Sequence, residues 1–244
     1  MNEVNIKPIT IKKSLLLFGV PSIIFYITTK YLIPYALLNL GFEYIFAWFL
    51  FGGLCVFIPL FILTFVLLKN EQKNLDRVII VNWLRLHKPN KKQIYVSIAA
   101  ALVCFVLSGL VVLTYNLLAD LTNLFGRLYS SQNSFDTGDA NPFVILIAWL
   151  PFFFFNIFGE ELLWRGFILP GQIENNGNIG WILNSIFWFV FHLSFDFQLL
   201  ITLLPILILL PYLVQKYQNT WIGIIIHTLY NGPIFVLITF GVIS

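Results

Sequence analysis

The chain has 244 residues, of which 59% are hydrophobic and only 10% are charged. A soluble domain contains about 25% charged residues, so this composition, with a mean hydropathy of +0.88, excludes an ordinary soluble protein. Repeated apolar runs of about 20 residues predict an all-α fold, a polytopic transmembrane helical bundle of about seven spans.

The first span is predicted at 12–29 and the second at 44–68. A short exposed segment that contains Lys30 and Glu43 is expected between them. No small-residue cleavage site follows the first apolar run, so we expect this run to be retained as a membrane span.

The segment 69–92 is the most polar part of the chain. It contains only two acidic residues, Glu71 and Asp76, against seven basic ones: Lys69, Lys73, Arg77, Arg85, Lys88, Lys91 and Lys92. Short loops rich in lysine and arginine stay in the cytoplasm, so this loop and the N-terminus are predicted to be cytoplasmic. Apolar residues within 75–86 predict an amphipathic helix on the membrane surface, with lipid as its partner. Topology already explains these charges, so no nucleic-acid partner is expected.

A third span is predicted at 93–117, followed by a polar segment at 118–141 whose only basic residue is Arg127. This segment is expected on the outer side. Four further spans are predicted at 142–169, 178–195, 198–215 and 220–242. We therefore divide the chain into N-terminal transmembrane helices, 1–140, and a catalytic core of four spans, 141–244.

Charged residues occur inside the span at 142–169. Glu160, Glu161 and Arg165 interrupt an otherwise apolar run, and a charge at the centre of a bilayer costs at least about 2.5–3.5 kcal/mol. His192 and His227 lie in two other spans, and Asn231 follows His227 by four residues. Packing alone hardly accounts for such a set, so a polar site within the membrane is predicted.

The spacing of these residues predicts a common depth. Glu160 lies eleven residues before Gly171, and His192 lies twelve residues after Gly180, about 16 and 18 Å along a helix. His227 and Asn231 follow Thr220 by about 10 and 16 Å at the same rise. Three helices are therefore expected to bring their polar groups into one layer.

Spacing on each helix predicts the contacts. Glu161 and Arg165 are four residues apart and can form an ion pair, whereas Glu160 points about 100° away, towards a cavity. Trp188 lies one turn before His192 and is expected to pack under its imidazole. A purely structural ion pair and packed, hydrogen-bonded histidines are the alternatives. Asp196 is interpreted as a residue of the membrane interface.

The sequence resembles the CAAX-protease and bacteriocin-processing (CPBP, or Abi) family of intramembrane endopeptidases. Its E-E-x-x-x-R motif is matched by Glu160 to Arg165, its F-x-x-x-H motif by His192, and its H-x-x-x-N motif by His227 and Asn231. Trp188 departs from the pattern, which has phenylalanine there. The resemblance covers about 141–244.

The resemblance implies that Glu160 is the general base, that His192 holds or polarises the water, and that His227 and Asn231 stabilise the oxyanion. Glu161, Arg165 and Trp188 would then support the site. The alternative chemistry is a zinc site formed by Glu161, His192 and His227, with water as the fourth ligand. We favour the mechanism that requires no cofactor.

The expected substrate is a peptide or a membrane protein. A scaffold that confers immunity to a bacteriocin, or a proton pathway, would use the same fold without proteolysis. Richness in Ile, Phe, Asn and Lys is typical of an AT-rich bacterial genome. This favours an integral protein of a bacterial cell membrane and makes a prenylated substrate less expected.

Overall fold

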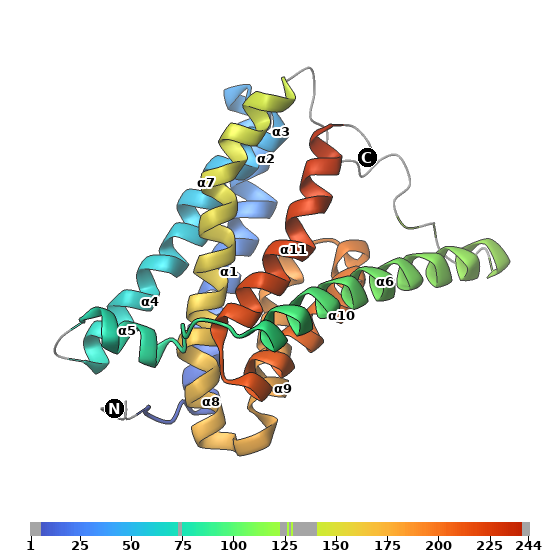
Figure 1. Ribbon diagram of the computed structural model, residues 1–244. Helices are drawn as coiled ribbons and strands as arrows, with labels where there is room; N and C mark the ends of the chain where they lie inside the picture. The colour runs from blue at the N-terminus through green and yellow to red at the C-terminus, as the bar shows by residue number, and fades with distance from the viewer. Residues whose placement is uncertain (1–5, 73–74, 123–125, 127, 129–140, 241–244) are drawn as a thin grey trace.

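The computed structural model describes residues 6–72, 75–122, 126, 128 and 141–240, and every regular element in these ranges is a helix (Figure 1). The polytopic helical bundle predicted from the sequence is confirmed. Most of the segment 118–141 lies outside the described residues, so its placement on the outer side stays a prediction.

The first span is longer than predicted. Helix α1, Ile11–Ile27, continues through a π-helical turn, Thr28–Leu32, into α2, Ile33–Leu40. The result is a 30-residue apolar helix that ends where Gly41 adopts a positive φ of 70°. The expected exposed segment after residue 29 is therefore wrong: Lys30 is part of the helix.

The second span also contains a π-helical part. Helix α3, Tyr44–Ala47, runs through the π-helical segment Trp48–Phe57 into α4, Ile58–Glu71.

The helix predicted within the basic loop is shorter than expected. It is α5, Arg77–Trp83, capped by Asp76, and it is held against the protein by the burial of Trp83 and by the Thr220 hydroxyl, which donates to the Leu84 carbonyl at 2.6 Å.

Helix α6, Lys91–Thr122, crosses the other helices obliquely (Figure 1). The fourth span is α7, Pro142–Glu160, which continues through the π-helical segment Glu161–Ile168 into α8, Leu169–Asn176. A 3₁₀ turn at Gly177–Ile179 reverses the chain into α9, Gly180–Phe191, and a second 3₁₀ turn at His192–Ser194 leads to α10, Phe197–Tyr217. Helix α11, Thr220–Thr239, completes the described chain.

In the described part of the chain, six helical stretches are long and apolar enough to cross a membrane, against about seven expected. The difference arises at α9: the apolar stretch Pro142–Ser194 includes α7, α8 and α9, although the chain reverses between α8 and α9. With only 12 residues, α9 is about 18 Å long, shorter than the hydrocarbon core of about 30 Å. Helix α9 is therefore too short to cross a membrane by itself, and His192 lies just beyond its last residue.

Aromatic stacking holds α9 against α1. The ring of Phe25 stacks on that of Phe191 at 4.8 Å, and Phe18 lies 5.4 Å from Phe187. These phenylalanines on α1 and α9, Phe187 excepted, are wholly buried. The first span therefore forms one wall of the C-terminal helices.

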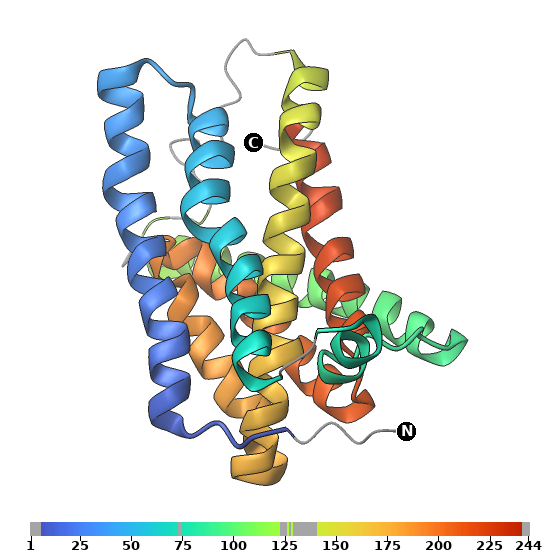
Figure 2. The same cartoon turned by 90° about the vertical axis from the view of Figure 1, so that its left-hand side faces the viewer.

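The N-terminal segment before α1, helix α5, the α8–α9 turn and the α10–α11 turn gather at one end of the bundle, in the lower part of Figures 1 and 2. The Ile9 amide donates to the Gly171 carbonyl at 2.8 Å, and the Thr220 amide donates to Arg85 at 3.0 Å. This is the end that the charge pattern assigns to the cytoplasm. The protein is an integral membrane protein, and its orientation stays a prediction.

Candidate active site

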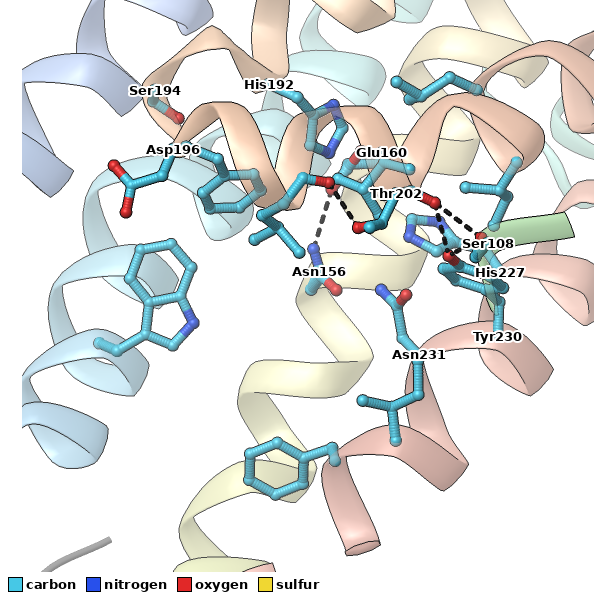
Figure 3. Close-up of a pocket in the computed structure, with 18 of the residues that line it drawn as sticks. Ser108, Asn156, Glu160, His192, Ser194, Asp196, Thr202, His227, Tyr230 and Asn231 are labelled. Atoms are coloured by element: carbon cyan, nitrogen blue, oxygen red, sulfur yellow. Dashed lines mark hydrogen bonds between the residues drawn. The ribbon is translucent and has the colours of Figure 1, made fainter. Parts of the chain in front are cut away.

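A cavity of about 870 Å³ lies between α1, α6, α7, α10 and α11. Five of the predicted site residues line it: Glu160, Trp188, His192, His227 and Asn231 (Figure 3). They come from three separate helical segments, as the depth argument predicts. Aromatic side chains form much of the remaining wall, including Trp48, Phe57, Trp149, Phe152, Phe153 and Phe195.

Glu160 is almost fully buried at the end of α7 and receives two hydrogen bonds. The Asn156 amide donates to its Oε1 at 2.9 Å, and the indole nitrogen of Trp188 donates to its Oε2 at 2.6 Å. A carboxylate oxygen has two lone pairs, so each oxygen still has a lone pair free after these bonds. Asn156 was not predicted, although it stands four residues before Glu160 in an otherwise apolar run.

Glu161 occupies a different environment from its neighbour. It is fully buried but does not line the cavity. Its Oε1 lies 3.2 Å from a terminal nitrogen of Arg165 and 2.9 Å from Nδ1 of His227. The predicted ion pair with Arg165 is therefore present, and Glu161 also contacts the histidine from behind the cavity wall.

Arg165 contributes charge more than directed hydrogen bonds. Its guanidinium is fully buried and within ion-pair distance of Glu161, but the angles satisfy no hydrogen bond. Its central carbon lies 3.4 Å from the ring centroid of Trp188, a cation–π contact. Trp188 therefore contacts both the arginine and Glu160.

Each of the two histidines is held through its Nδ1 atom. Nδ1 of His192 lies 2.9 Å from the Trp188 carbonyl, and Nδ1 of His227 lies 2.9 Å from the Glu161 carboxylate. Because a carbonyl and a carboxylate only accept, Nδ1 carries the proton in each ring. Nε2 is therefore the nitrogen left for a bound molecule. The ring of Trp188 makes edge contacts with both imidazoles, at 5.4 and 5.6 Å, which agrees with its predicted packing at His192.

Asn231 projects into the cavity beside Asn156 and His227 (Figure 3). A buried hydroxyl network stabilises this part of α11: Ser108 donates to the Thr202 carbonyl at 2.7 Å, and its hydroxyl lies 2.8 Å from that of Tyr230. The network joins α6, α10 and α11 next to the residues of the third motif. Isolated hydroxyls in apolar spans gave no signal of it in the sequence.

Gly223 allows α11 to approach Glu161. A Cβ atom at this position would lie 2.3 Å from Oε2 of Glu161 and 3.1 Å from Val214. Gly223 stands one turn before His227, so it sets the distance at which His227 meets the carboxylate. Sequence reasoning missed this glycine because its only signal is a contact with another helix.

The zinc alternative requires Glu161, His192 and His227 to converge, and they do not fit this role. Glu161 stands behind His227, and its nearer oxygen is engaged by both Arg165 and Nδ1 of the histidine. Among the residues that the structure describes, no group of three His, Cys, Asp or Glu side chains is arranged to hold a metal ion.

Residues 142–232 match a family model described as type II CAAX prenyl endopeptidase Rce1-like. This confirms the family predicted from the three motifs. The match supports a CAAX-type intramembrane protease. The matched segment contains all seven residues that sequence reasoning assigned to the site. Searches against curated proteins and against solved structures gave no significant match.

Proposed function

We propose that the protein is an intramembrane endopeptidase that uses Glu160 to activate a water molecule for peptide hydrolysis. The proposal rests on the different surroundings of two adjacent glutamates. Glu160 lines the cavity and is held by two neutral donors, whereas Glu161 is paired with Arg165 behind the cavity wall. A general base must reach its substrate, and of the two carboxylates Glu160 is the one that can.

In the first step, Glu160 takes a proton from water while the water oxygen bonds to the carbonyl carbon of the scissile peptide. The carbonyl oxygen then carries the negative charge. Collapse of this intermediate breaks the C–N bond, and the proton held by Glu160 passes to the leaving nitrogen. A carboxylate suits this exchange because it can accept a proton and return it in the next step.

Nε2 of His192 is the proposed acceptor that orients the water, because its Nδ1 proton is already committed to the Trp188 carbonyl. Asn231 offers an amide donor for the oxyanion without a change of charge. His227 can donate from Nε2 only as an imidazolium, because Nδ1 already donates to Glu161. The Glu161 carboxylate would balance that charge, which gives the second glutamate a supporting role.

The substrate that we propose is a peptide or membrane protein whose scissile bond reaches the cavity beside the end of α9. The mechanism requires no metal ion, in keeping with the arrangement of the two glutamates described above. The cavity wall is mostly aromatic and apolar, so it suits an apolar segment of substrate. A non-proteolytic scaffold would need no free base facing this cavity.

The proposal is tested by replacing Glu160 with glutamine, which removes the proton acceptor and preserves size. Membrane peptides of a Glu160→Gln strain should accumulate uncut precursors relative to the wild type. The matched control is Glu174→Gln, an exposed glutamate on α8, which should leave the peptide pattern unchanged. An unchanged pattern in the Glu160→Gln strain, at wild-type protein level, would return the scaffold interpretation to first place.

A further inference from the structure

A groove on the outer surface of the bundle lies apart from the site described above. It has a volume of about 300 Å³ and lies between α1 and the second span, which run side by side (Figure 2). An apolar cavity of this kind stays free of water, so its occupant is expected to be apolar. None of the side chains that line it is charged: Leu16, Leu17, Val20, Pro21 and Ile24 on α1, and Cys55, Val56, Pro59, Leu60 and Leu63 on the second span.

The floor of the groove belongs to the protein core, whereas its rim is open. Val56 and Leu60 are each only 2% exposed. Leu16 and Val20, on the rim formed by α1, are 64% and 48% exposed. Both helices are membrane spans by length and composition, so the opening faces the hydrocarbon of the bilayer. A chain that fills the groove restores dispersion contacts that its lining otherwise lacks.

The length and depth of the groove match one leaflet of a membrane. From Leu16 to Ile24, α1 rises about 12 Å, and half of the hydrocarbon core is about 15 Å thick. The groove begins only one helical turn from the first residues of α1, at the end of the bundle where α5 also lies. An acyl chain that enters from this leaflet can therefore lie along the groove.

An ion-pair cluster fixes the register of the two helices at this end. Nζ of Lys13 lies 3.6 Å from one carboxylate oxygen of Glu71, and Nζ of Lys7 lies 2.6 Å from the other. Lys13 belongs to the first turn of α1 and Glu71 is the last residue of α4, so these two turns are level. Two lysines surround one glutamate, which leaves the cluster with a net positive charge.

Two polar residues continue the walls of the groove towards this end. Lys12 precedes Leu16 by four residues and Asn70 follows Leu63 by seven, so each lies on the groove side of its helix. Both residues are exposed, and neither side chain has an ion pair or hydrogen bond to another described residue. A lysine near the end of a span extends to the lipid head groups. The ammonium and the amide are both donors, as a phosphate oxygen requires.

The groove and the active-site cavity lie on different sides of the same two helices. Ile24 lines the groove and the next residue, Phe25, lines the cavity; Val56 and Phe57 are divided in the same way. An occupant of the groove therefore packs behind the cavity wall. It cannot reach Glu160, so the groove is a separate site.

We propose that the groove binds an anionic glycerophospholipid, with one acyl chain along its apolar floor and the phosphate beside Lys12 and Asn70. The apolar lining selects the chain, and the positive charge at the head-group end selects the anionic lipid. This inference is independent of the proposed peptidase function, because it uses none of the residues assigned to catalysis.

The test uses full-length protein purified in detergent and washed free of bound lipid. Phosphatidylglycerol and phosphatidylcholine with identical acyl chains are titrated separately, and native mass spectrometry counts the bound molecules and measures their affinities. Phosphatidylglycerol with a photoreactive diazirine on one acyl chain then locates the site by cross-linking and peptide mapping. Thermal unfolding confirms that each variant is folded.

Two substitutions have matched controls. Lys12→Gln removes the charge at the head-group end, and Lys69→Gln removes an exposed lysine from the last turn of α4 that does not continue the groove. Val20→Phe fills the groove, whereas Val103→Phe enlarges a side chain of α6 that is 47% exposed and outside it.

We expect one phosphatidylglycerol per chain, bound about fivefold more tightly than phosphatidylcholine, which is the effect of one lysine near an anionic lipid. Cross-links should fall within 16–24 and 55–63. Lys12→Gln should lose the preference for the anionic lipid, and Val20→Phe should lose the cross-links. The two control variants should behave like the wild type.

Equal affinities for the two lipids in the wild type, or an undiminished preference in Lys12→Gln, would overturn the proposal. Cross-links spread over all spans would also overturn it, because they indicate an unspecific lipid annulus. A dimer mass without bound lipid would assign the groove to a second copy of the chain. Lys12→Gln changes only an exposed side chain, so it decides the question even if Val20→Phe fails to fold.

Discussion

The indole nitrogen of Trp188 lies 2.6 Å from Oε2 of Glu160, and the Arg165 guanidinium lies over the face of the same indole, 3.4 Å from its centroid. One side chain thus orients the proposed base and places a cation near it. Phenylalanine, which the family pattern has at this position, would keep the ring and lose the hydrogen bond.

Trp188→Phe should therefore lower kcat by about tenfold or more, because a hydrogen bond to a charged group contributes about 1.5–3 kcal/mol. KM should change little, since the ring that contacts the cavity is retained. The matched control is Trp221→Phe, which removes an indole donor to the Leu86 carbonyl at 3.3 Å, away from the site. Equal kcat values for the two variants would argue against the orienting role of Trp188.

Arg165→Ala should lower folded yield and thermal stability as well as activity. It leaves Glu161 buried without its cation, and breaking a buried pair costs about 3–5 kcal/mol. The control is Lys7→Ala, which removes the exposed partner of Glu71 and should leave the melting temperature nearly unchanged. Size-exclusion chromatography and thermal unfolding in detergent measure both variants. Wild-type stability of Arg165→Ala would contradict the pairing.

Gly223→Ala should disrupt the site without altering any catalytic group. Its methyl carbon would lie 2.3 Å from Oε2 of Glu161, so the carboxylate or α11 must move and His227 loses its partner. Gly19→Ala on α1 is the control, because a Cβ there meets nothing within 4 Å and alanine is favoured over glycine in helices. We expect loss of peptide cleavage in the first variant and unchanged cleavage in the second.

Asn231→Ala should leave a measurable remainder of activity, reduced by about 10²–10³ as is typical when one oxyanion donor is lost. His227→Ala should reduce activity further, because it also leaves Glu161 without the hydrogen bond from Nδ1. Single-turnover cleavage of a peptide cut by the wild type compares the two. If Asn231→Ala were the more damaging change, the assignment of donors would have to be reversed.

The orientation can be tested with single cysteines in a background that lacks Cys55 and Cys104. Lys88→Cys lies in the basic loop and Glu43→Cys lies in the link between α2 and α3, and both positions are exposed. A membrane-impermeant maleimide added to intact cells should label position 43 and leave position 88 unlabelled. The opposite pattern would invert the topology.

The sequence was sufficient to predict the contacts of residues whose partners lie one turn away or at a common depth. Four-residue spacing predicted the pairing of Glu161 with Arg165, and counting helical rise predicted that His192, His227 and Glu160 line one cavity. The same rule could have found Asn156. Both rules use only spacing along the sequence, so they group the site residues without knowledge of the fold.

Other features depend on contacts between distant segments. In the sequence, Lys30 marks the end of an apolar run, because the aspartate that pairs with it, Asp196, is 166 positions away. Helix α9 ends at Phe191, four residues before the predicted end of its span, since apolar residues continue past His192. Gly223 resembles any other helical glycine until Glu161 is placed opposite it.

The π-helical segment Glu161–Ile168 begins at the boundary between the two glutamates. A wide turn accommodates one more residue than an α-helical turn of the same rise. Deleting a single residue between Leu162 and Trp164 would therefore tighten the turn and rotate Arg165 by about 100° relative to Glu161, while α7 would keep Glu160 in the cavity. The distinct surroundings of two chemically identical neighbours are thus a matter of helical register, and a change in length can abolish them without changing the type of any site residue.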